Sequence, residues 1–167
     1  MDNMGDDAVL PIGLASLAAV LEENLHRVTV IDGPGEALDV YFPLEGVANG
    51  RRYGLRDKEV VARIPADTKF IGVTVMFSME WLPARGLINL IREQFPEVTI
   101  IAGGEHITAL PEYCIQDCAA LDYCVLGEGE QTINELVEAV ESSGEAHMVE
   151  GLCLRRNGDA VRTKPRA

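Results

Sequence analysis

The sequence is poor in basic residues. Its 14 Lys and Arg stand against 27 Asp and Glu, which gives a formal net charge of −13 at pH 7. Proteins that bind the phosphate backbone of nucleic acids, or an anionic membrane surface, do so through clustered Lys and Arg. We therefore expect neither nucleic acid nor a membrane among the partners of this chain.

Long apolar runs are also missing. No stretch approaches the roughly 18 consecutive apolar residues that a membrane-spanning helix needs. The first residues, MDNMGDDAVLP, are acidic and do not have the basic-then-apolar layout of a secretory signal peptide. These two absences predict a cytoplasmic protein.

Motifs that hold phosphates or assemble a catalytic centre are absent as well. The turn containing Gly127 and Gly129 has Thr132 where a GxGxxG dinucleotide fingerprint needs its last glycine. Glu128 and Glu130 in the same turn would repel a pyrophosphate. The sequence contains neither a GxxxxGK[ST] P-loop nor a GxSxG nucleophile elbow. We predict no catalytic residues that act within this chain alone.

The residues that could bind a metal are few and poorly spaced. The four cysteines lack the paired spacing of a zinc site and predict buried thiols that pack as small hydrophobic groups. Of the three histidines, two fall in turns or polar loops, and only His106 follows a predicted strand. We predict no metal ligands. The cysteines are Cys114, Cys118, Cys124 and Cys153, and the other histidines are His26 and His147.

The order of apolar segments predicts one α/β domain over residues 1–167. Amphipathic periodicity predicts the helices, and short, almost wholly apolar runs predict the strands. Residues 33–65 form a glycine-rich excursion, and residues 150–164 form a C-terminal hairpin around Asn157-Gly158-Asp159. The predicted helices are 10–24 (with Leu14, Leu17, Ala18 and Leu21 on one face), 55–64, 82–95, 110–118 and 130–144; the predicted strands are 27–32, 69–76, 98–104 and 122–127.

Strands that alternate with helices, and that are apolar throughout, are typical of a doubly wound, mostly parallel, Rossmann-like sheet. Ligands of such sheets bind beyond the carboxyl ends of the strands. The segments FSMEW, GGEH and GEGE each follow a predicted strand, so we expect them at one edge of the sheet. The chain opens on a helix, so either another strand takes the place of the usual first one, or the chain is a piece of a longer protein.

The order and the amino-acid sequences of these segments resemble those of a known protein family. The segments are FIGVTVMFSMEW, then VTIIAGGEHITALPEY, then LDYCVLGEGEQTINEL. They resemble the cobalamin-binding domain at the N-terminus of cobalamin-dependent radical SAM proteins, of the Fe–S oxidoreductase and methyltransferase type. The resemblance spans Leu10 to Arg156, except for Gly33 to Pro65. It rests mainly on the paired GGxHxTxxPE and GEGExT elements.

The resemblance implies a cofactor, cobalamin, and a role for each matching position. Gly103 and Gly104 would let the backbone approach the nucleotide tail, so Gly104→Val is expected to abolish cobalamin retention and leave the fold intact. The other implied binding residues are Met76, Phe77, Ser78 and Met79 in the wall of the tail groove, His106 and Thr108 holding the loop or contacting the corrin side chains, and Gly127, Glu128 and Gly129 in the opposite wall.

Two departures from the family pattern limit what the resemblance implies. An Asp-x-His-x-x-Gly motif is absent, so the lower axial ligand of cobalt is left open. The CxxxCxxC motif that binds a [4Fe–4S] cluster is also absent. We therefore expect the cluster, S-adenosylmethionine and the radical SAM catalytic domain only in a longer parent protein, beyond the C-terminus.

Two functions remain open at this stage. The chain is either the cobalamin-binding module of a radical SAM enzyme that carries out methyl transfer or related radical chemistry, or a domain that keeps the fold without cobalamin. In the second case it would serve as a scaffold or as a docking module for a substrate or protein.

Overall fold

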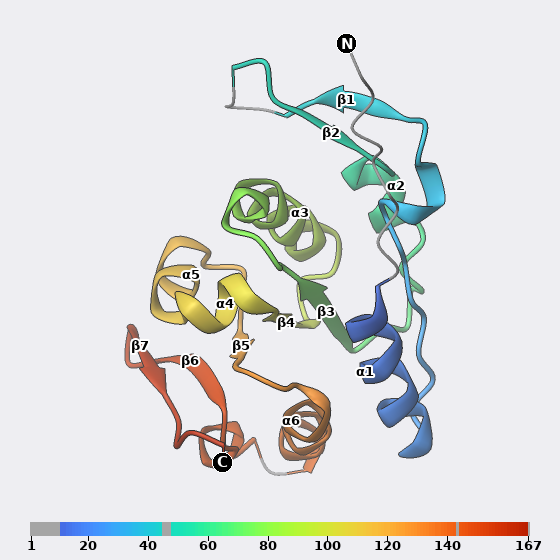
Figure 1. The fold of residues 1–167 in the computed structure, drawn as a ribbon. Coiled ribbons are helices and arrows are strands. Elements are labelled where there is room, and N and C mark those ends of the chain that lie inside the picture. The colour runs from blue at the N-terminus through green and yellow to red at the C-terminus, as the bar shows by residue number, and fades with distance from the viewer. Residues whose placement is uncertain (1–10, 45–47, 143, 167) are drawn as a thin grey trace.

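A computed structural model describes residues 11–44, 48–142 and 144–166, and its core is a five-stranded sheet (Figure 1). The strands lie in the order β3 (Phe70–Thr74), β4 (Thr99–Gly103), β5 (Tyr123–Val125), β6 (Leu152–Arg156) and β7 (Asp159–Arg162). The first three strands are parallel, and the last two are antiparallel to their neighbours. The predicted doubly wound α/β fold is confirmed, with the C-terminal hairpin built into the sheet.

Helices cover both faces of the sheet, which explains why successive residues of the interior strand β4 are apolar. In β4, Ile100 and Ala102 pack into the core that α3 (Trp81–Gln94), α4 (Glu105–Ala109) and α5 (Pro111–Asp117) cover. Ile101, between them, faces the other core, under α6 (Glu130–Ser142). Successive side chains of a strand point to opposite faces, so a strand covered on both sides needs apolar residues at every position.

The first helix, α1 (Ile12–Glu23), lies beside α6, on the same side of the sheet. Leu17 and Leu21 of its predicted apolar face pack against the core under α6, and every residue of that face is partly buried. The predicted helix and the predicted orientation are confirmed, except for Leu10, which lies outside the described residues.

The predicted strand at residues 27–32 is wrong. This segment has no regular secondary structure, and among the described residues no pairing joins it to β3, which is one of the two edge strands of the sheet. The run Val28-Thr29-Val30-Ile31 has the β-branched composition of a strand. A strand, however, forms only where a neighbour exchanges backbone hydrogen bonds with it. Composition alone therefore predicted an element that lacks a partner in the described residues.

The excursion at residues 33–65 is more ordered than its glycine content suggests. It contains a short 3₁₀ turn (Gly35–Ala37), the antiparallel pair β1 (Tyr41–Pro43) and β2 (Arg51–Tyr53), and α2 (Asp57–Ala62). The predicted helix at 55–64 is thus confirmed as α2, with shorter bounds, and the small hairpin escaped the sequence reading. Phe42 anchors this hairpin, because its buried ring lies under the guanidinium groups of Arg52 and Arg56.

The C-terminal elements follow their sequence signals. Asn157 and Gly158 join β6 to β7 with φ of 53° and 91°, the two positive values that an Asn-Gly hairpin turn adopts. A further 3₁₀ turn (Ala146–Met148) follows α6. All four cysteines are buried and unpaired, as predicted. Within the described residues, no helix is long and apolar enough to cross a membrane.

Candidate functional site

Three loops that leave the carboxyl ends of β3, β4 and β5 are joined to one another by hydrogen bonds. The backbone N–H of His106 donates to the carbonyl oxygen of Val75 at 3.2 Å. The backbone N–H of Gly127 donates to Oγ1 of Thr108 at 3.0 Å. The prediction that these segments meet at one edge of the sheet is confirmed. We call residues 76–80, 103–108 and 126–130 together the strand-exit loops.

The first of these loops presents apolar side chains to the outside. Met76, Phe77 and Met79 are 45%, 65% and 79% exposed. The carboxylate of Glu80 fixes the loop, because its Oε2 accepts hydrogen bonds from the backbone N–H groups of Met76 (2.9 Å) and Phe77 (3.1 Å). Exposed apolar groups that lie next to one another mark a binding surface more often than chance exposure does.

The second loop begins with two glycines, which differ in the space that each leaves for an added side chain. A Cβ on Gly103 would meet only ordinary contacts, the nearest being the carbonyl oxygen of Val125 at 3.9 Å. A Cβ on Gly104 would lie 2.6 Å from the carbonyl oxygen of Val75, and the φ of Gly104 is +107°. The expectation that Gly104→Val would spare the fold is therefore wrong, because the side chain would collide with the backbone of Val75, directly before the first loop.

Gly103 lines the edge of the sheet without such a collision. It is the last residue of β4 and is partly buried. Since a side chain can be added there, Gly103 is the glycine that can test whether a ligand lies against this part of the backbone.

The third loop has glycine for two different reasons. Gly127 has a φ of +69° and open space where a Cβ would be, so its conformation requires glycine and its surroundings do not. A Cβ on Gly129 would lie 3.1 Å from the side chain of Leu17, which makes Gly129 a packing position under α1. Glu128, between them, is exposed. The loop therefore offers a bare backbone at Gly127 and an exposed carboxylate at Glu128.

Glu130 joins this loop to α1. The hydroxyl of Ser16 donates a 2.7 Å hydrogen bond to Oε1 of Glu130. This bond, followed by bonds from the backbone N–H groups of Glu130 and Gly129, lowers the pKa of the Glu130 carboxyl below its ordinary value. The carboxylate thus stays ionised while it holds the start of α6 against α1.

His106 and Thr108 both hold loops together. Thr108 accepts the hydrogen bond from Gly127 already described. His106 is 5% exposed, and its Nδ1 lies 3.0 Å from Oγ of Ser78, in the first loop. The resemblance implied that this pair either holds the loop or contacts the corrin side chains. These contacts support the first role.

A cluster of residues behind His106 escaped the sequence reading. The ring of Trp81 lies against the imidazole, with centroids 5.7 Å apart, and its Nε1 donates to Oδ2 of Asp117 at 2.8 Å. Arg85 also pairs with Asp117, at 2.7 Å. The hydrogen bond from Trp81 is the main reason why the pKa of Asp117 is lowered. Trp81 follows Glu80 directly and is the single tryptophan of the chain. Its place beside a predicted strand end was the one sequence feature that could have pointed to this cluster.

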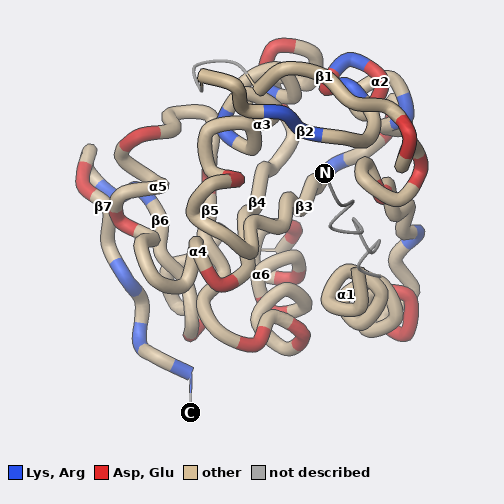
Figure 2. The backbone as a smooth tube through the Cα atoms, turned by 45° about the horizontal axis from the view of Figure 1, so that its top comes forward, with Lys and Arg blue, Asp and Glu red and all other residues tan. Residues whose placement is uncertain are grey.

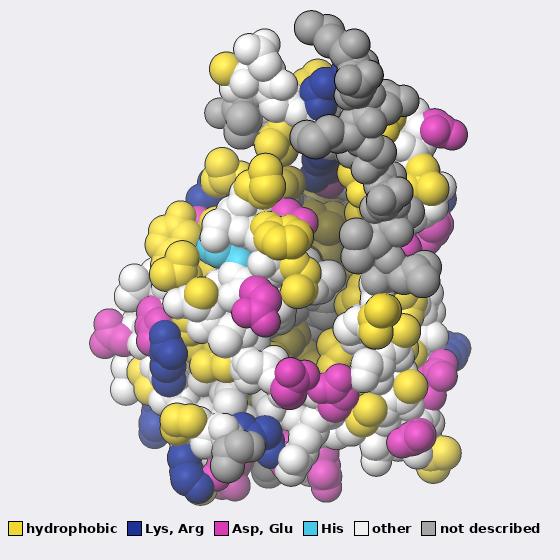
Figure 3. Space-filling model, in the orientation of Figure 1, with side chains coloured by type: hydrophobic (Ala, Val, Ile, Leu, Met, Phe, Trp, Pro, Cys, Tyr) yellow, Lys and Arg dark blue, Asp and Glu magenta, His cyan; other side chains and the backbone are white. Residues whose placement is uncertain are grey.

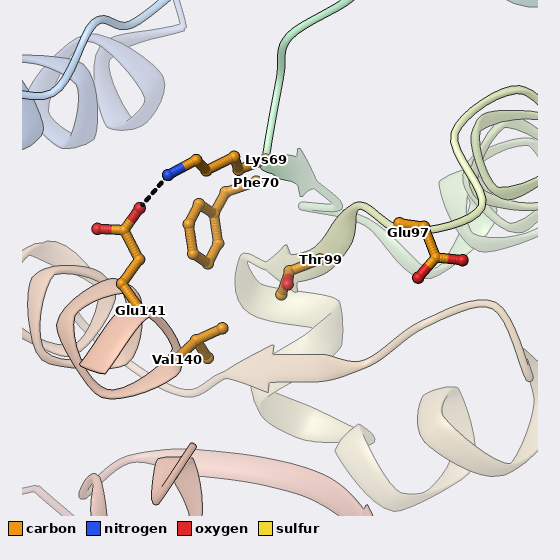
Figure 4. Close-up of a pocket in the computed structure, with 6 residues that line it drawn as sticks. All are labelled: Lys69, Phe70, Glu97, Thr99, Val140 and Glu141. Carbon is orange, nitrogen blue, oxygen red and sulfur yellow. Dashed lines mark hydrogen bonds and ion pairs between the residues drawn. The ribbon is translucent and has the colours of Figure 1, made fainter. Parts of the chain in front are cut away.

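Two hollows lie at opposite edges of the sheet. Figure 3 shows one over β3, between the strand-exit loops and α1, with hydrophobic side chains in its wall. The other opens at the amino ends of β3 and β4, where the ion pair between Lys69 and Glu141 (3.0 Å) crosses its rim (Figure 4). Its lining residues are Lys69, Phe70, Glu97, Thr99, Val140 and Glu141. Only the first hollow lies at the carboxyl edge, where doubly wound sheets bind their ligands.

The charges around the strand-exit loops are negative. These loops contain four glutamates and no Lys or Arg, and Figure 2 shows basic residues farther off, on β2 and in the C-terminal segment. The glutamates are Glu80, Glu105, Glu128 and Glu130. Glu80 and Glu130 are engaged in the bonds given above. The edge therefore suits a ligand whose contacts are apolar groups and neutral amides better than a polyphosphate.

The cysteines contribute to packing in this region. Burial raises the pKa of Cys114 to about 12 and that of Cys153 to about 11, and it raises the pKa of Cys124 further. A thiol with a raised pKa keeps its proton and is a poor nucleophile and metal ligand. Across the described ranges, no three His, Cys, Asp or Glu side chains come together as a metal site.

Comparisons with known proteins agree with this geometry. Residues 6–137 match the family model of the B12 binding domain. Two curated methyltransferases are each 30% identical to this chain over 156 residues, an uncharacterized one from Pyrococcus horikoshii and the cytidylyl-2-hydroxyethylphosphonate methyltransferase of Streptomyces wedmorensis. The alignments cover 93% of this chain but 30% and 29% of the two relatives, so the chain spans less than a third of their length.

A solved structure shows the same fold. The radical S-adenosylmethionine methyltransferase TsrM from Kitasatospora setae, with cobalamin and a [4Fe–4S] cluster bound, superposes with a TM-score of 0.71 at 21% identity. The superposition covers 99% of this chain and 28% of TsrM. The likeness therefore concerns the fold of almost the whole chain and about a quarter of the larger enzyme.

Proposed function

Because this chain belongs to the B12-binding domain family, we propose that its three strand-exit loops bind cobalamin. The observation that carries the proposal is their arrangement at one sheet edge, where exposed Met76, Phe77 and Met79 stand beside the accessible backbone of Gly103 and Gly127. A large cofactor rich in neutral amides and apolar edges needs such a surface, with room for its bulk and few charges to desolvate.

Each group of residues has its own task in this proposal. Met76, Phe77 and Met79 cover apolar parts of the cofactor and exclude water from them. The hydroxyls of Ser78 and Thr108 supply hydrogen bonds, and Gly103 and Gly127 leave space for the nucleotide tail. Glu128, on the exposed rim, faces amide groups of the corrin ring. Gly104 and Gly129 act indirectly, because each lets a loop pack closely against its neighbour.

Cobalamin, when bound, supplies the cobalt at which a methyl group or a related radical step is handled. The protein supplies position, a hydrogen-bonding edge and a dry apolar surface. We further propose that the parent protein carries a radical SAM catalytic domain, with the [4Fe–4S] cluster and S-adenosylmethionine. The support for this is the length and the names of the relatives, which extend well beyond the region shared with this chain.

We also propose a cytoplasmic location. The support is the four buried thiols, all unpaired, which is the state that a reducing compartment maintains.

Retention of the cofactor tests the proposal. The full chain is mixed with an excess of hydroxocobalamin, desalted, and examined by visible absorption. We expect corrin absorbance to elute with the protein at about one equivalent. If hydroxo-, methyl- and adenosylcobalamin all elute separately from a folded chain, the cobalamin proposal fails, and the scaffold or docking function becomes the better account.

Cobinamide, which lacks the nucleotide tail, serves as the matched control ligand. If the tail lies against Gly103 and Gly127 as proposed, cobinamide is retained less well than cobalamin. Equal retention of the two would contradict the proposed position of the tail and leave cobalamin binding itself intact.

A further inference from the structure

Three polar side chains, joined by two contacts, run from the core to the surface of the candidate site. Cys114 is fully buried, and its Sγ lies 3.6 Å from Nε2 of His106. The other ring nitrogen, Nδ1, lies 3.0 Å from Oγ of Ser78. Ser78 itself is exposed in the first strand-exit loop. The imidazole thus bridges a buried thiol and an exposed hydroxyl.

The positions of the protons on Cys114, His106 and Ser78 depend on which of these groups can form hydrogen bonds with other partners. A neutral imidazole has one N–H donor and one bare nitrogen acceptor. If Nε2 is bare, the thiol of Cys114 donates to it, and the N–H of Nδ1 donates to Ser78. If Nδ1 is bare, Ser78 donates inward, and the thiol proton has no acceptor among the contacts of Cys114 in the described residues.

Burial decides between these two arrangements. A buried donor without an acceptor is destabilising, whereas an exposed hydroxyl can always donate to water or to a ligand. The raised pKa of Cys114 keeps its thiol protonated, so a donor is present at Nε2. The arrangement that satisfies every buried group is therefore Cys114 S–H to Nε2, and Nδ1–H to Ser78.

We propose that His106 is a positioning residue that turns Ser78 into a dedicated hydrogen-bond donor toward the bound cofactor. Because one Oγ lone pair of Ser78 accepts from Nδ1–H, the hydroxyl proton is not used inward and is left for a group outside the protein. The group that this proton meets must be an acceptor, such as an amide carbonyl oxygen or an unprotonated ring nitrogen. This inference rests on the proposed cobalamin function, since it assigns Ser78 a role within that site.

The ring is held in place from behind. Trp81 lies against the imidazole with the two planes tilted by 41°. The indole N–H is in turn fixed by Asp117, which Arg85 also binds. Because these contacts restrict the rotation of both rings, Nδ1 stays directed at Ser78 before any ligand arrives. The site therefore spends little entropy on orienting this hydroxyl when the cofactor binds.

The tautomer of His106 can be measured without any cofactor. The full chain, labelled with ¹⁵N-histidine, is examined by long-range ¹H–¹⁵N correlation, and His106→Asn identifies the signal of His106 among those of the three histidines. We expect a protonated Nδ1 and a bare Nε2. A predominant Nε2–H tautomer in the wild-type chain would overturn the proposal. The variant Cys114→Ala removes the donor to Nε2 and is expected to shift the population toward Nε2–H.

Cobalamin affinity then tests the functional consequence. The loss of one directed hydrogen bond is expected to weaken hydroxocobalamin binding roughly tenfold in Ser78→Ala. His106→Leu should weaken it by a similar factor, and the double variant should be no weaker than either single one. His106→Asn, whose amide nitrogen can replace Nδ1, should recover most of the affinity. The exposed His147→Asn is the matched control and should bind like the wild type.

The two levels of failure are separable. If the wild-type chain does not retain cobalamin, the proposed function fails, while the tautomer measurement still decides the proton arrangement. If the wild type binds cobalamin and a folded His106→Leu variant binds it equally well, the positioning role of His106 is wrong and the proposed function stands.

Discussion

The backbone N–H of Gly127 donates a 3.0 Å hydrogen bond to Oγ1 of Thr108, and so joins the loop after β5 to the helix after β4. Gly127 can direct its N–H there because its φ is +69°, a conformation in which glycine is unstrained. The two glycine-containing loops therefore form one connected edge of the sheet. The proposed binding surface depends on this connection.

Replacing Thr108 by Val removes that bond with little change of shape. We expect the free energy of unfolding to fall by about 1 kcal/mol, the usual net value of such a bond, and the amide of Gly127 to exchange faster. Urea unfolding and hydrogen exchange measure the two effects. Thr29→Val, at an exposed position, is the control. Unchanged exchange at Gly127 would mean that Thr108 does not hold the third loop.

Gly104→Ala should destabilise the chain by about 1–3 kcal/mol, the range for a strained backbone conformation. The physical reason is the 2.6 Å approach of the added Cβ to the carbonyl oxygen of Val75, together with a φ of +107°. Gly13→Ala in α1 is the matched control, because a Cβ there meets nothing within 4 Å among the described residues. Thermal unfolding compares the two variants. Equal stability of both would refute the close approach.

Asp117→Asn should destabilise the chain in a pH-dependent way. The pKa of Asp117 is lowered by its bonds to Trp81 and Arg85, so the ionised form is favoured in the folded state. Its stabilising effect is therefore complete above the ordinary value of 3.8 and is lost as the pH falls through the lowered folded pKa.

The urea midpoints of the wild type and Asp117→Asn, followed by circular dichroism, should differ at pH 7 and converge near the acid limit of folding. Asp39→Asn, at an exposed position, controls for the general effect of removing one carboxylate. A difference between wild type and Asp117→Asn that grows on acidification would contradict the assigned cause of the shift.

Met79→Ser should weaken hydroxocobalamin binding without changing stability. Met79 is 79% exposed in the free chain, so folding gains little from its burial and ligand binding can gain more. Covering most of this side chain is worth about 1–2 kcal/mol, or roughly 5- to 30-fold in affinity. Met148→Ser, at a comparably exposed position (71%), is the control. A cobalamin titration in which the two variants bind alike would argue against the first loop as part of the site.

Much of the fold could be read from the sequence because its signals are local. The apolar run of β4, the amphipathic pattern of α6 and the Asn157-Gly158 turn each determine an element without reference to distant residues. The segment 27–32 shows where this reading fails. Its β-branched residues satisfy the local signal, but strand formation depends on a neighbour that no local pattern reveals.

The candidate site was likewise predictable only in part. Parallel strands bring their carboxyl ends to one edge, so the meeting of the three loops followed from topology. The contact from Cys114 to His106 and that from Trp81 to Asp117 did not, because each depends on how α3, α4 and α5 pack. Cys114 was predicted only as a small buried hydrophobic group, and its place beneath His106 is visible only in three dimensions.

Hydrogen exchange of the full chain, followed by mass spectrometry with and without hydroxocobalamin, tests the central claim most directly. If cobalamin binds at the strand-exit loops, amide protection appears in peptides that cover residues 76–80, 103–108 and 126–130. Peptides around Lys69, Glu97 and Glu141, at the opposite edge, should exchange as before. Protection at that opposite edge, or none anywhere, would contradict the account.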